Sequence, residues 1–283
     1  MNIVGLGKAG CSIADALSQY PQYTVYKIDA GASHQEVAGA SRVFYIPEQG
    51  DPEKYEESVP LMETFFRGIS GEVVFVVSGG AKVAGACLAI LEQIKHCKIT
   101  ILYIKPNLST LDSAKATMQH VCFGVLQEYA RSAVFERFIA IDNDVVEAIL
   151  GDVPIIGYYD KLNELIVWAF HTYNVLRHTE PVMGKVNETK VTCRISTLGT
   201  VDLESGEEKL FFPLDKVREK SYYYVLKNED LVSSGKLLKK INEQVKNLTE
   251  ESARGSYAIY SSEYNKNFIL CAAHTPHIQP AQE

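Results

Sequence analysis

Two glycine-rich turns constrain the fold of this chain more than any other feature of its sequence. The apolar run Asn2–Val4 passes directly into Gly5–Gly10 (GLGKAG), and Cys11–Leu17 then begins an apolar helix. A second apolar run, Val73–Val77, leads into Ser78–Gly85 (SGGAKVAG) and another helical segment. A strand that passes through glycines into a helix directs backbone N–H groups and a positive helix end towards an anion. Two such turns in one domain predict two loops that converge on one anionic ligand.

The first half of the chain alternates short apolar runs with longer helical segments. Such strands, separated by helices of a dozen or more residues, pair in parallel and carry helices on both faces. We therefore predict an α/β domain with a Rossmann-like, doubly wound parallel sheet. The further expected strands are Tyr23–Ile28, Val43–Ile46, Ile99–Ile104 and Phe138–Ile141, and the expected helices are the later part of Glu53–Ile69, Val83–Lys95, and Leu111–Phe135 with Ser109 or Thr110 as its cap.

One long helix, Tyr158–Arg177, is expected at the centre of the chain, and its apolar residues surround much of its circumference, as in a helix buried between two layers. A loop at 178–187 follows, and the pattern then favours short strands. These are Val191–Ser196, Leu210–Phe212, Tyr222–Leu226, Ser256–Ser261 and Phe268–Ala273, with one helix at Asp230–Leu248 and a disordered tail over the last ten residues. We predict a nucleotide-binding domain at 1–157, a central helix at 158–178 and a smaller α+β C-terminal domain at 179–283.

Composition excludes several classes of function. The net charge of −7 argues against direct, non-specific binding of nucleic acid, which needs a basic surface. The six cysteines lie far apart, and neither they nor the histidines have a spacing that suggests a metal site, so we expect reduced thiols and no bound metal at these residues. The longest apolar stretch, Val73–Leu91, is interrupted by polar residues and glycines and predicts no membrane span. With a core strand at the N-terminus, these features predict a cytoplasmic protein.

The first turn alone resembles a dinucleotide-binding fingerprint. Gly5, Gly7 and Gly10 fit G-x-G-x-x-G, and Asp29 ends the expected second strand where an acidic residue could bind a ribose. Lys8 and Ser12 lie inside the turn, and each could reach phosphate oxygens or remain a solvated surface residue.

The second glycine-rich turn and two asparagines suggest a larger nucleotide. A second nest of amides at Ser78–Gly85, with Lys82 as its charged member, suits a ligand with several phosphates held between two loops. Asn163 lies within an otherwise apolar helix and needs a hydrogen-bond partner, which a base edge or a backbone carbonyl could supply. Asn143 belongs to an Asp-Asn-Asp sequence that could equally be a turn signal. No histidine has a spacing that suggests catalysis.

Taken in order, these motifs resemble those of the tubulin/FtsZ superfamily over roughly residues 1–190. Gly5–Ser12 is similar to the first nucleotide loop of FtsZ, Ser78–Gly85 occupies the place of the tubulin signature loop G-G-G-T-G-[ST]-G, and Tyr158–Arg177 resembles the central helix. The resemblance implies a site for GTP or GDP, with Mg²⁺ as a possible companion of the phosphates, and a head-to-tail homopolymer. The residues that it assigns to nucleotide binding are Gly5, Gly7, Lys8, Ala9, Gly10, Cys11, Ser12, Asp29, Ser78, Gly79, Gly80, Ala81, Lys82, Asn143 and Asn163.

The chain also departs from the family pattern. The signature loop lacks its Thr-Gly-Thr core, with Lys82 and Val83 in that place. The family's catalytic loop, N-x-D-x-x-D, acts on the neighbouring subunit's nucleotide, whereas here only Asn187 and Glu188 stand as candidates. Because water activation at a phosphate needs positioned polar groups and usually a metal, we expect weak or absent hydrolysis.

Three functions stay open on the sequence. The first is a GTP-binding, filament-forming protein with little hydrolysis. The second is a nucleotide-free structural or assembly protein of the same fold, which the altered signature loop favours. The third is a Rossmann NAD(P)-binding oxidoreductase, which the G-x-G-x-x-G sequence and Asp29 favour but which leaves the second glycine turn unexplained.

Overall fold

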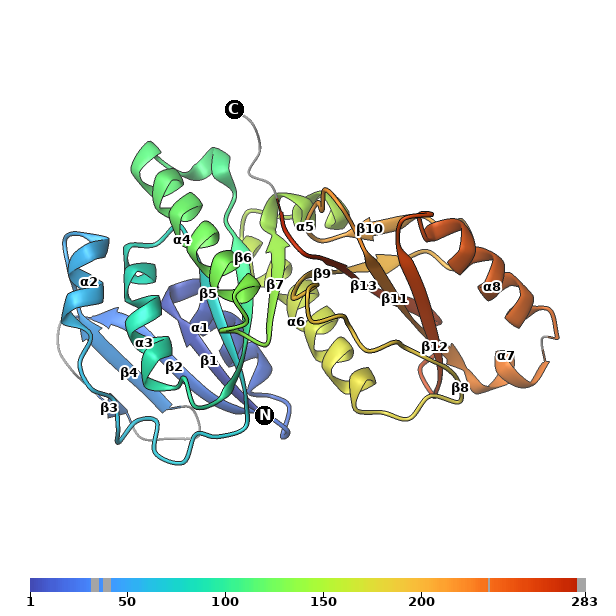
Figure 1. The fold of residues 1–283 in the computed structure, drawn as a ribbon, viewed down its shortest axis with the longest axis horizontal. Coiled ribbons are helices and arrows are strands. Elements are labelled where there is room, and N and C mark those ends of the chain that lie inside the picture. Colours follow the sequence, from blue (N-terminus) through green and yellow to red (C-terminus); the bar gives the residue numbers. More distant parts are fainter. Residues whose placement is uncertain (32–35, 38–41, 234, 279–283) are drawn as a thin grey trace. The chain divides into compact units, whose positions relative to one another are not determined.

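The apolar runs of the first half form one sheet in the computed structural model, which describes residues 1–31, 36–37, 42–233 and 235–278 (Figure 1). Its strands are β1 (Asn2–Leu6), β2 (Thr24–Gly31), β3 (Glu36–Val37), β4 (Arg42–Pro47), β5 (Glu72–Ser78), β6 (Lys98–Lys105) and β7 (Arg137–Asp142). They lie in the order β3-β4-β2-β1-β5-β6-β7, and every pairing is parallel except that of β3 with β4. Burial on both faces explains why the central strand β5 is almost continuously apolar. The prediction of a doubly wound parallel sheet is confirmed.

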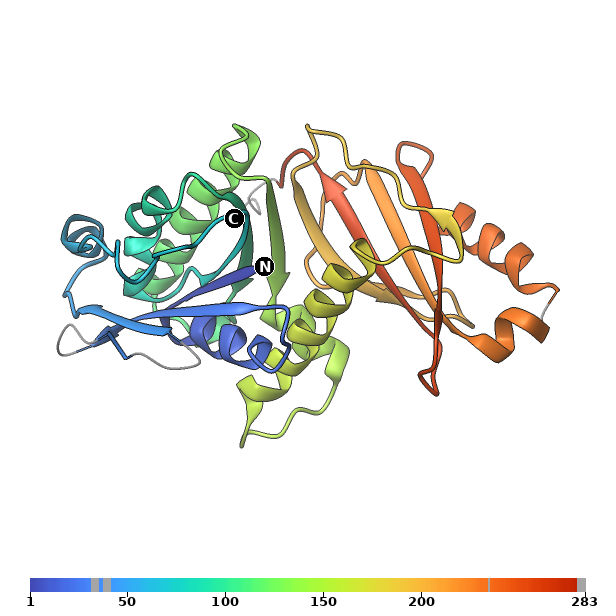
Figure 2. The same cartoon turned by 90° about the horizontal axis from the view of Figure 1, so that it is seen from below.

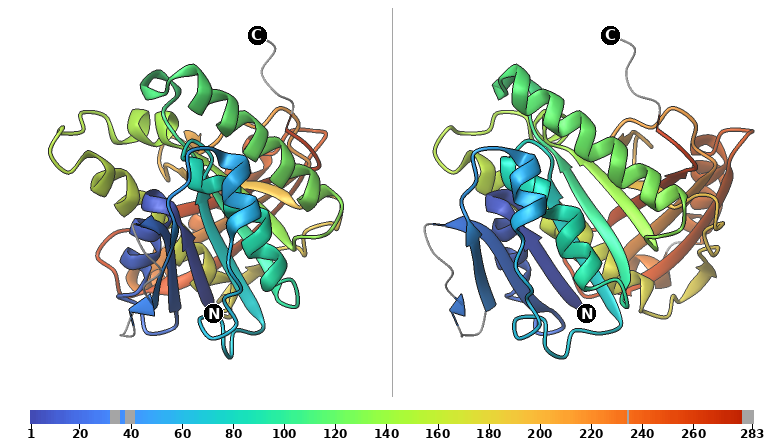
Figure 3. Two further views of the ribbon diagram at one scale, coloured as in Figure 1. Left: turned by 90° about the vertical axis from the view of Figure 1, so that its left-hand side faces the viewer. Right: turned by 60° about the vertical axis from the view of Figure 1, so that its left-hand side comes forward.

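Helices cover both faces of this sheet. They are α1 (Gly7–Leu17), α2 (Pro52–Ser58), α3 (Cys87–Gln93), α4 (Ser113–Arg131) and α5 (Asn143–Leu150). The chain moves in one direction along the sheet from β1 to β2 and in the other from β5 to β6, so right-handed crossovers place α1 and α3 on opposite faces. Figure 3 shows α3 and α4 together on one face. The strand order reverses between β1 and β5, and in open α/β sheets ligands bind at the carboxyl ends of the strands at such a point.

Several predicted helix boundaries in this half are wrong. The helix expected in the later part of Glu53–Ile69 instead occupies the early part, as α2, because Val59 precedes a proline and takes an extended conformation with ψ 118°. The predicted Leu111–Phe135 helix begins only at Ser113, since the side chain of Asp112 caps it by accepting from the backbone N of Lys115 at 2.9 Å. The helix predicted at Val83–Lys95 begins as a 3₁₀ turn over Lys82–Ala86 and continues as α3.

The central helix α6 has the predicted bounds, Tyr158–Arg177, and the chain divides inside it into two compact units, Met1–Val167 and Trp168–Glu283. The second unit has its own mixed sheet. Its strands are β8 (Met183–Lys185), β9 (Ile195–Val201), β10 (Glu208–Leu210), β11 (Glu219–Lys227), β12 (Arg254–Ser262) and β13 (Phe268–Thr275). Their order is β9-β13-β11-β12-β8, with β10 paired to β9. Although β12 and β13 are consecutive, β11 lies between them, parallel to β12 and antiparallel to β13.

Alternating side chains of β11 build two cores in the second unit. Tyr222 and Tyr224 pack with Ile241 and other apolar side chains under α8 (Leu237–Leu248). Tyr223 faces the opposite side, where its ring lies 5.8 Å from that of Tyr173 in the second half of α6. Figure 2 shows α6 and α8 on opposite faces of this sheet.

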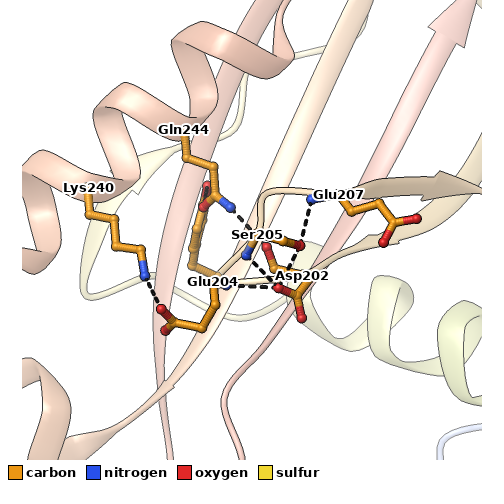
Figure 4. Close-up of polar contacts among 7 residues, drawn as sticks. Asp202, Glu204, Ser205, Glu207, Lys240 and Gln244 are labelled. Atoms are coloured by element: carbon orange, nitrogen blue, oxygen red, sulfur yellow. Dashed lines mark hydrogen bonds and ion pairs between the residues drawn. The ribbon is translucent and has the colours of Figure 1, made fainter.

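The turn between β9 and β10 is fastened to α8 by polar contacts (Figure 4). Asp202 Oδ1 accepts from the backbone N of Glu204 at 3.0 Å and from that of Ser205 at 2.7 Å. Lys240 forms an ion pair with Glu204 at 2.7 Å, and Gln244 Nε2 donates to the carbonyl oxygen of Asp202 at 3.0 Å. These contacts account for the acidic residues of this turn without a ligand.

Predictions for the second half also need correction. The helix expected at Asp230–Leu248 is two helices, α7 (Asn228–Ser233) and α8, with Gly235 at the interruption. The loop predicted at 178–187 contains β8, and the strand expected from Val191 begins at Ile195. The predicted tail is wrong for residues 274–278, since β13 continues to Thr275 and Ile278 is buried, while residues 279–283 lie outside the described part.

Candidate functional site

The two glycine-rich turns meet at the carboxyl edge of the first unit's sheet. Because β1 pairs in parallel with β5, and Leu6 lies opposite Val77, Gly7 and Ser78 leave adjacent strands side by side. Gly7 has φ +70°, and a Cβ atom placed on it would lie 2.8 Å from Cγ1 of Val83. The second turn therefore contacts the first, whereas their convergence on one anionic ligand stays a prediction.

Close packing explains why three of the other positions in the two turns, Gly5, Gly10 and Gly79, are glycines. A Cβ atom on Gly10 would lie 2.4 Å from the carbonyl oxygen of Val76, and one on Gly5 would lie 2.4 Å from that of Gly10. In the second turn, a Cβ atom on Gly79 would lie 2.1 Å from Tyr103 Oη. These glycines hold α1 against β1 and β5 and bring the second turn against β6.

The amino end of α1 is open to an anion. The helix begins directly at Gly7, no side chain caps it, and its first turn contains no acidic residue. The first N–H groups of a helix have no partner within it, and they carry the positive end of its dipole. Lys8 and Ser12 are exposed beside this helix end, and Ala9 is half-buried. This arrangement can bind a phosphate or a carboxylate.

Asp29 lies beside this helix end, since Ile28 pairs with Leu6. The strand β2 continues past it to Gly31, so Asp29 does not end the strand as predicted. Its Oδ1 accepts from the backbone N of Ala30 at 2.8 Å. Partial burial raises the pKa of the Asp29 carboxyl, while the Ala30 N–H and the charge of Lys8 oppose that shift.

Cys11 is a structural thiol. Its Sγ donates to the carbonyl oxygen of Ile28 at 3.4 Å. Burial, together with the nearby charge of Asp29, raises the pKa of Cys11 to about 12. A thiol with so high a pKa is neither a good nucleophile nor a ready metal ligand at neutral pH.

Asn143 occupies the same edge of the sheet, three strands away from β1. It is the first residue of α5 and is 8% exposed, and its Oδ1 has no hydrogen-bond partner among the described residues. Both carboxylate oxygens of its neighbour Asp142 have partners. Oδ1 caps α5 by accepting from the backbone N of Asp144 at 3.0 Å, and Oδ2 forms an ion pair with Lys105 at 2.7 Å. With about 4.8 Å between neighbouring strands, Asn143 lies roughly 14 Å along the edge from Gly7. The Asp-Asn-Asp sequence therefore starts a helix and leaves one amide oxygen unused.

Three polar residues that the sequence analysis did not assign to the site form a hydrogen-bonded group near Asn143. Asn107 Nδ2 donates to Glu147 Oε2 and to Tyr158 Oη, each at 3.1 Å, and Tyr158 Oη donates to Glu147 Oε2 at 2.5 Å. Desolvation and the bond to Glu147 raise the pKa of Tyr158 to about 12. The spacing i, i+4 of Asn143 and Glu147 could have indicated that they share one face of a helix.

Asn163 lies in the first half of α6 and is half-buried. Tyr159, one turn earlier on the same face of the helix, is 58% exposed. An aromatic ring and an amide at this spacing can stack on a base and bond to its edge.

The two catalytic candidates belong to the second unit. Asn187 and Glu188 are exposed on the connection between β8 and β9. The backbone around them is anchored, because the N of Asn187 donates to Ser256 Oγ at 3.2 Å and Arg254 donates to the carbonyl oxygen of Glu188 at 3.0 Å. Their side chains are thus presented to solvent on a fixed loop.

Neither a metal site nor a membrane-spanning helix is found among the described residues. No group of three or more His, Cys, Asp or Glu side chains there could hold a metal ion. None of the helices there combines the length and apolar character needed to cross a membrane.

Solved structures with the same fold cover nearly the whole chain. The FtsZ dimer of M. jannaschii matches 97% of this chain and 87% of its own, with a TM-score of 0.68 and 11% identity. A GTPγS-form protofilament of TubZ from Bacillus thuringiensis serovar israelensis matches 98% and 87%, with a TM-score of 0.70 and 13% identity. GDP-bound CetZ1 from Haloferax volcanii matches 98% and 94%, with a TM-score of 0.68 and 14% identity.

Sequence comparison adds nothing, since no protein-family model and no curated protein matches the chain. At identities of 11–14% the structural matches establish the fold. The chain therefore has the fold of FtsZ, TubZ and CetZ, and the resemblance to the tubulin/FtsZ superfamily that its motifs indicated is confirmed at the level of the fold.

Proposed function

We propose that this chain binds a guanine nucleotide, GTP or GDP, at the carboxyl edge of its first sheet and assembles head to tail with weak or absent hydrolysis. The observation that carries the proposal is the contact of the two glycine turns beside the uncapped amino end of α1. Phosphates suit this place because unpaired N–H groups and a helix dipole both favour a negative charge.

The rest of the edge has groups suited to a nucleoside. The unused Oδ1 of buried Asn143 can accept an N–H of a base, which would satisfy an acceptor that is costly to leave unpaired. Guanine presents such N–H groups on its Watson–Crick edge. Asn163 and the exposed ring of Tyr159 offer a second polar contact and a stacking surface.

The other residues predicted to bind the nucleotide would make secondary contacts with it or shape the turns around it. Ala81 and Lys82 are exposed, and the ammonium group of Lys82 can approach the phosphates. Gly80 and Ser78 shape the second turn. Mg²⁺ would be held by the phosphates and water, with the Ser12 hydroxyl as a candidate protein ligand.

Little hydrolysis is proposed because the loop at Asn187 and Glu188 carries a single carboxylate. Three structural neighbours are described as a GTPγS-form protofilament of TubZ, a GDP-bound monomer of CetZ1 and an empty dimer of FtsZ, so nucleotide binding and self-association both occur among proteins of this fold. A heterologous contact between copies produces a filament when its rotation does not close.

One observation favours the second candidate, a nucleotide-free assembly protein. The apolar side chain of Val83 is 7% exposed and packs on Gly7, so it occupies part of the space between the turns. In this alternative the glycines serve packing only.

Nucleotide titration separates the two candidates. We expect GDP to bind the wild-type chain, and Lys8→Glu to weaken binding about tenfold or more, since it places a like charge at the phosphate end. The matched control is Lys98→Glu, another exposed lysine, at the opposite, amino edge of the sheet, which should bind as the wild type does. Saturable binding of NADH in place of GDP would support the oxidoreductase, and no binding of either would support the nucleotide-free protein.

A further inference from the structure

Each of the two glycine-rich turns carries one lysine and no carboxylate. Residues 5–12 contain Lys8, residues 78–85 contain Lys82, and neither range contains Asp or Glu. Both lysines are exposed, and neither forms an ion pair with any residue that the structure describes. A single unpaired lysine is ordinary on a protein surface. Here, however, the two lysines belong to two loops that touch each other.

The contact between the turns brings the two lysines to one place. The Cγ1 atom of Val83 lies 2.8 Å from the position of a Cβ atom on Gly7, and these two residues are the chain neighbours of Lys82 and Lys8, respectively. Flexible four-carbon side chains let both ammonium groups reach the same ligand above the turns. The uncapped amino end of α1 adds a partial positive charge there. Two ammonium groups carry the same charge as one divalent cation.

Three carboxylates that the fold brings towards this edge have partners of their own. Asp29 is also separated from the second turn, because its strand β2 and the second turn's strand β5 lie on opposite sides of β1. Asp51 precedes Pro52, whose carbonyl oxygen packs on Gly85 at the end of the second turn. The three partnered carboxylates are Asp29 with the backbone N of Ala30 at 2.8 Å, Asp51 with Lys54 at 3.3 Å, and Asp142 with Lys105 at 2.7 Å.

The turns suit a polyphosphate better than they suit a hydrated Mg²⁺ ion. In nucleotide sites Mg²⁺ usually keeps several waters and is held by one or two carboxylates together with the phosphates. The turns leave only the hydroxyls of Ser12 and Ser78 as side-chain oxygen ligands. Where the turns meet, Val83 presents an apolar side chain that is 7% exposed. A cation there would also be repelled by two ammonium groups.

We propose that Lys8 and Lys82 together supply the positive charge that a divalent cation would otherwise bring to the phosphates, so that the chain binds GDP and GTP without Mg²⁺. This inference rests on the nucleotide site proposed above and concerns how that site neutralises its ligand. Each ammonium group is a compact charge with three N–H donors, and one from each turn can hold the phosphate chain from both sides. A Mg²⁺ ion that accompanies the phosphates then adds little to the affinity.

Removal of divalent cations is the first test. Calorimetric titration of GDP into the wild-type chain should give dissociation constants within about threefold of each other in EDTA and in excess Mg²⁺. A loss of affinity of about a hundredfold or more in EDTA would overturn the proposal, since the lysines would then not replace the cation.

Neutral variants test the lysines themselves. Lys8→Gln and Lys82→Gln should each weaken GDP binding about tenfold or more in EDTA, because each removes one of two charges at the phosphates. Excess Mg²⁺ should recover much of the loss, so the variants gain a Mg²⁺ dependence that the wild type lacks. Lys8→Arg and Lys82→Arg keep the charge and should remain independent of Mg²⁺.

Lys98→Gln is the matched control, since Lys98 is exposed at the opposite, amino edge of the sheet. It should bind GDP as the wild type does in both buffers. All of these side chains are exposed, so the midpoints of thermal unfolding should match that of the wild type. Glutamine variants that bind GDP as tightly as the wild type in EDTA, or that lose the same affinity in both buffers, would overturn the proposal.

The outcomes separate this inference from the function on which it rests. If GDP binds the wild type only in the presence of Mg²⁺, the lysines do not replace the cation, while the nucleotide site stands. If neither GDP nor GTP binds in either buffer, the nucleotide site itself is overturned, and the role of the lysines with it.

Discussion

The two glycine-rich turns look alike in sequence and differ in structure. In the first, Gly7 opens the amino end of α1, and no side chain caps it. In the second, Gly79 is closed in by Tyr103, and Val83 turns inward onto the first turn. The first turn thus has the features of an anion site, an uncapped helix start without acidic residues, whereas the second turn makes packing contacts with Tyr103 and with the first turn. A glycine-rich turn in a sequence therefore identifies a place where backbones approach closely, and the ligand must be argued from what remains uncovered.

The largest effect should come from Gly10, where α1 meets a strand backbone. In Gly10→Ala the new Cβ would lie 2.4 Å from the carbonyl oxygen of Val76, which cannot move without moving β5. We expect a loss of about 3 kcal/mol or more in the free energy of unfolding, measured by urea denaturation. The control, Gly124→Ala in α4, meets no atom within 4 Å and should be neutral or slightly stabilising. Equal stability of the two variants would contradict the packing role of the first turn.

The second turn should tolerate an added methyl group better, because the atom nearest to a Cβ on Gly79 is a side-chain oxygen and the backbone Cα of Gln119 lies farther away, at 3.1 Å. Gly79→Ala should cost about 2 kcal/mol, since its Cβ would lie 2.1 Å from Tyr103 Oη. Adding Tyr103→Phe removes that oxygen and should restore roughly half of the loss, a favourable coupling of about 1 kcal/mol in a double-mutant cycle. Additive losses would show that the two residues do not oppose each other.

Val83 distinguishes an open site from a filled one. Val83→Ala should lower the free energy of unfolding by roughly 1–2 kcal/mol, because it leaves a small cavity. If phosphates lie between the turns, the same change should tighten GDP binding about threefold or more by calorimetry, since the space beside Gly7 grows. Unchanged affinity in a chain that binds GDP would place the phosphates elsewhere.

The smallest effect concerns the reactivity of Cys11 behind the first turn. Its pKa is raised to about 12, so the thiolate is scarce at pH 8, and its alkylation rate should keep rising with pH beyond pH 10. The pKa of Cys97 is also raised, but Cys97 is less buried than Cys11. Because reagent reaches it more easily, Cys97 should be alkylated faster than Cys11 at pH 8. Mass spectrometry of iodoacetamide-treated protein gives both rates, and a Cys11 rate that levels off near pH 9 would contradict the assignment.

Much of the fold could be predicted because it depends on local patterns. Apolar runs such as Val73–Val77 become buried parallel strands, and α6 has the bounds that its periodicity indicates. Errors arose where a neighbour in sequence overrides the pattern. Pro60 ends α2 early, and Asp142 serves as a helix cap rather than a turn.

The candidate site was less accessible to prediction. The meeting of the turns follows from the pairing of β1 with β5, but Val83 on Gly7 and the unpaired oxygen of Asn143 depend on contacts between distant residues. The same is true of the group of Asn107, Glu147 and Tyr158, whose members come from the loop after β6, from α5 and from α6. Spacing in a sequence does not encode such contacts.

The nucleotide content of the purified protein tests the central claim most directly. Acid extraction of freshly purified wild-type chain, followed by chromatography of the supernatant, measures what the two turns hold. We predict a guanine nucleotide, GDP or GTP, at a substantial fraction of one per chain, and a reduced amount in Lys8→Glu. Protein that carries no nucleotide and binds neither GDP nor GTP at millimolar concentration would contradict the claim that the two turns form one nucleotide site.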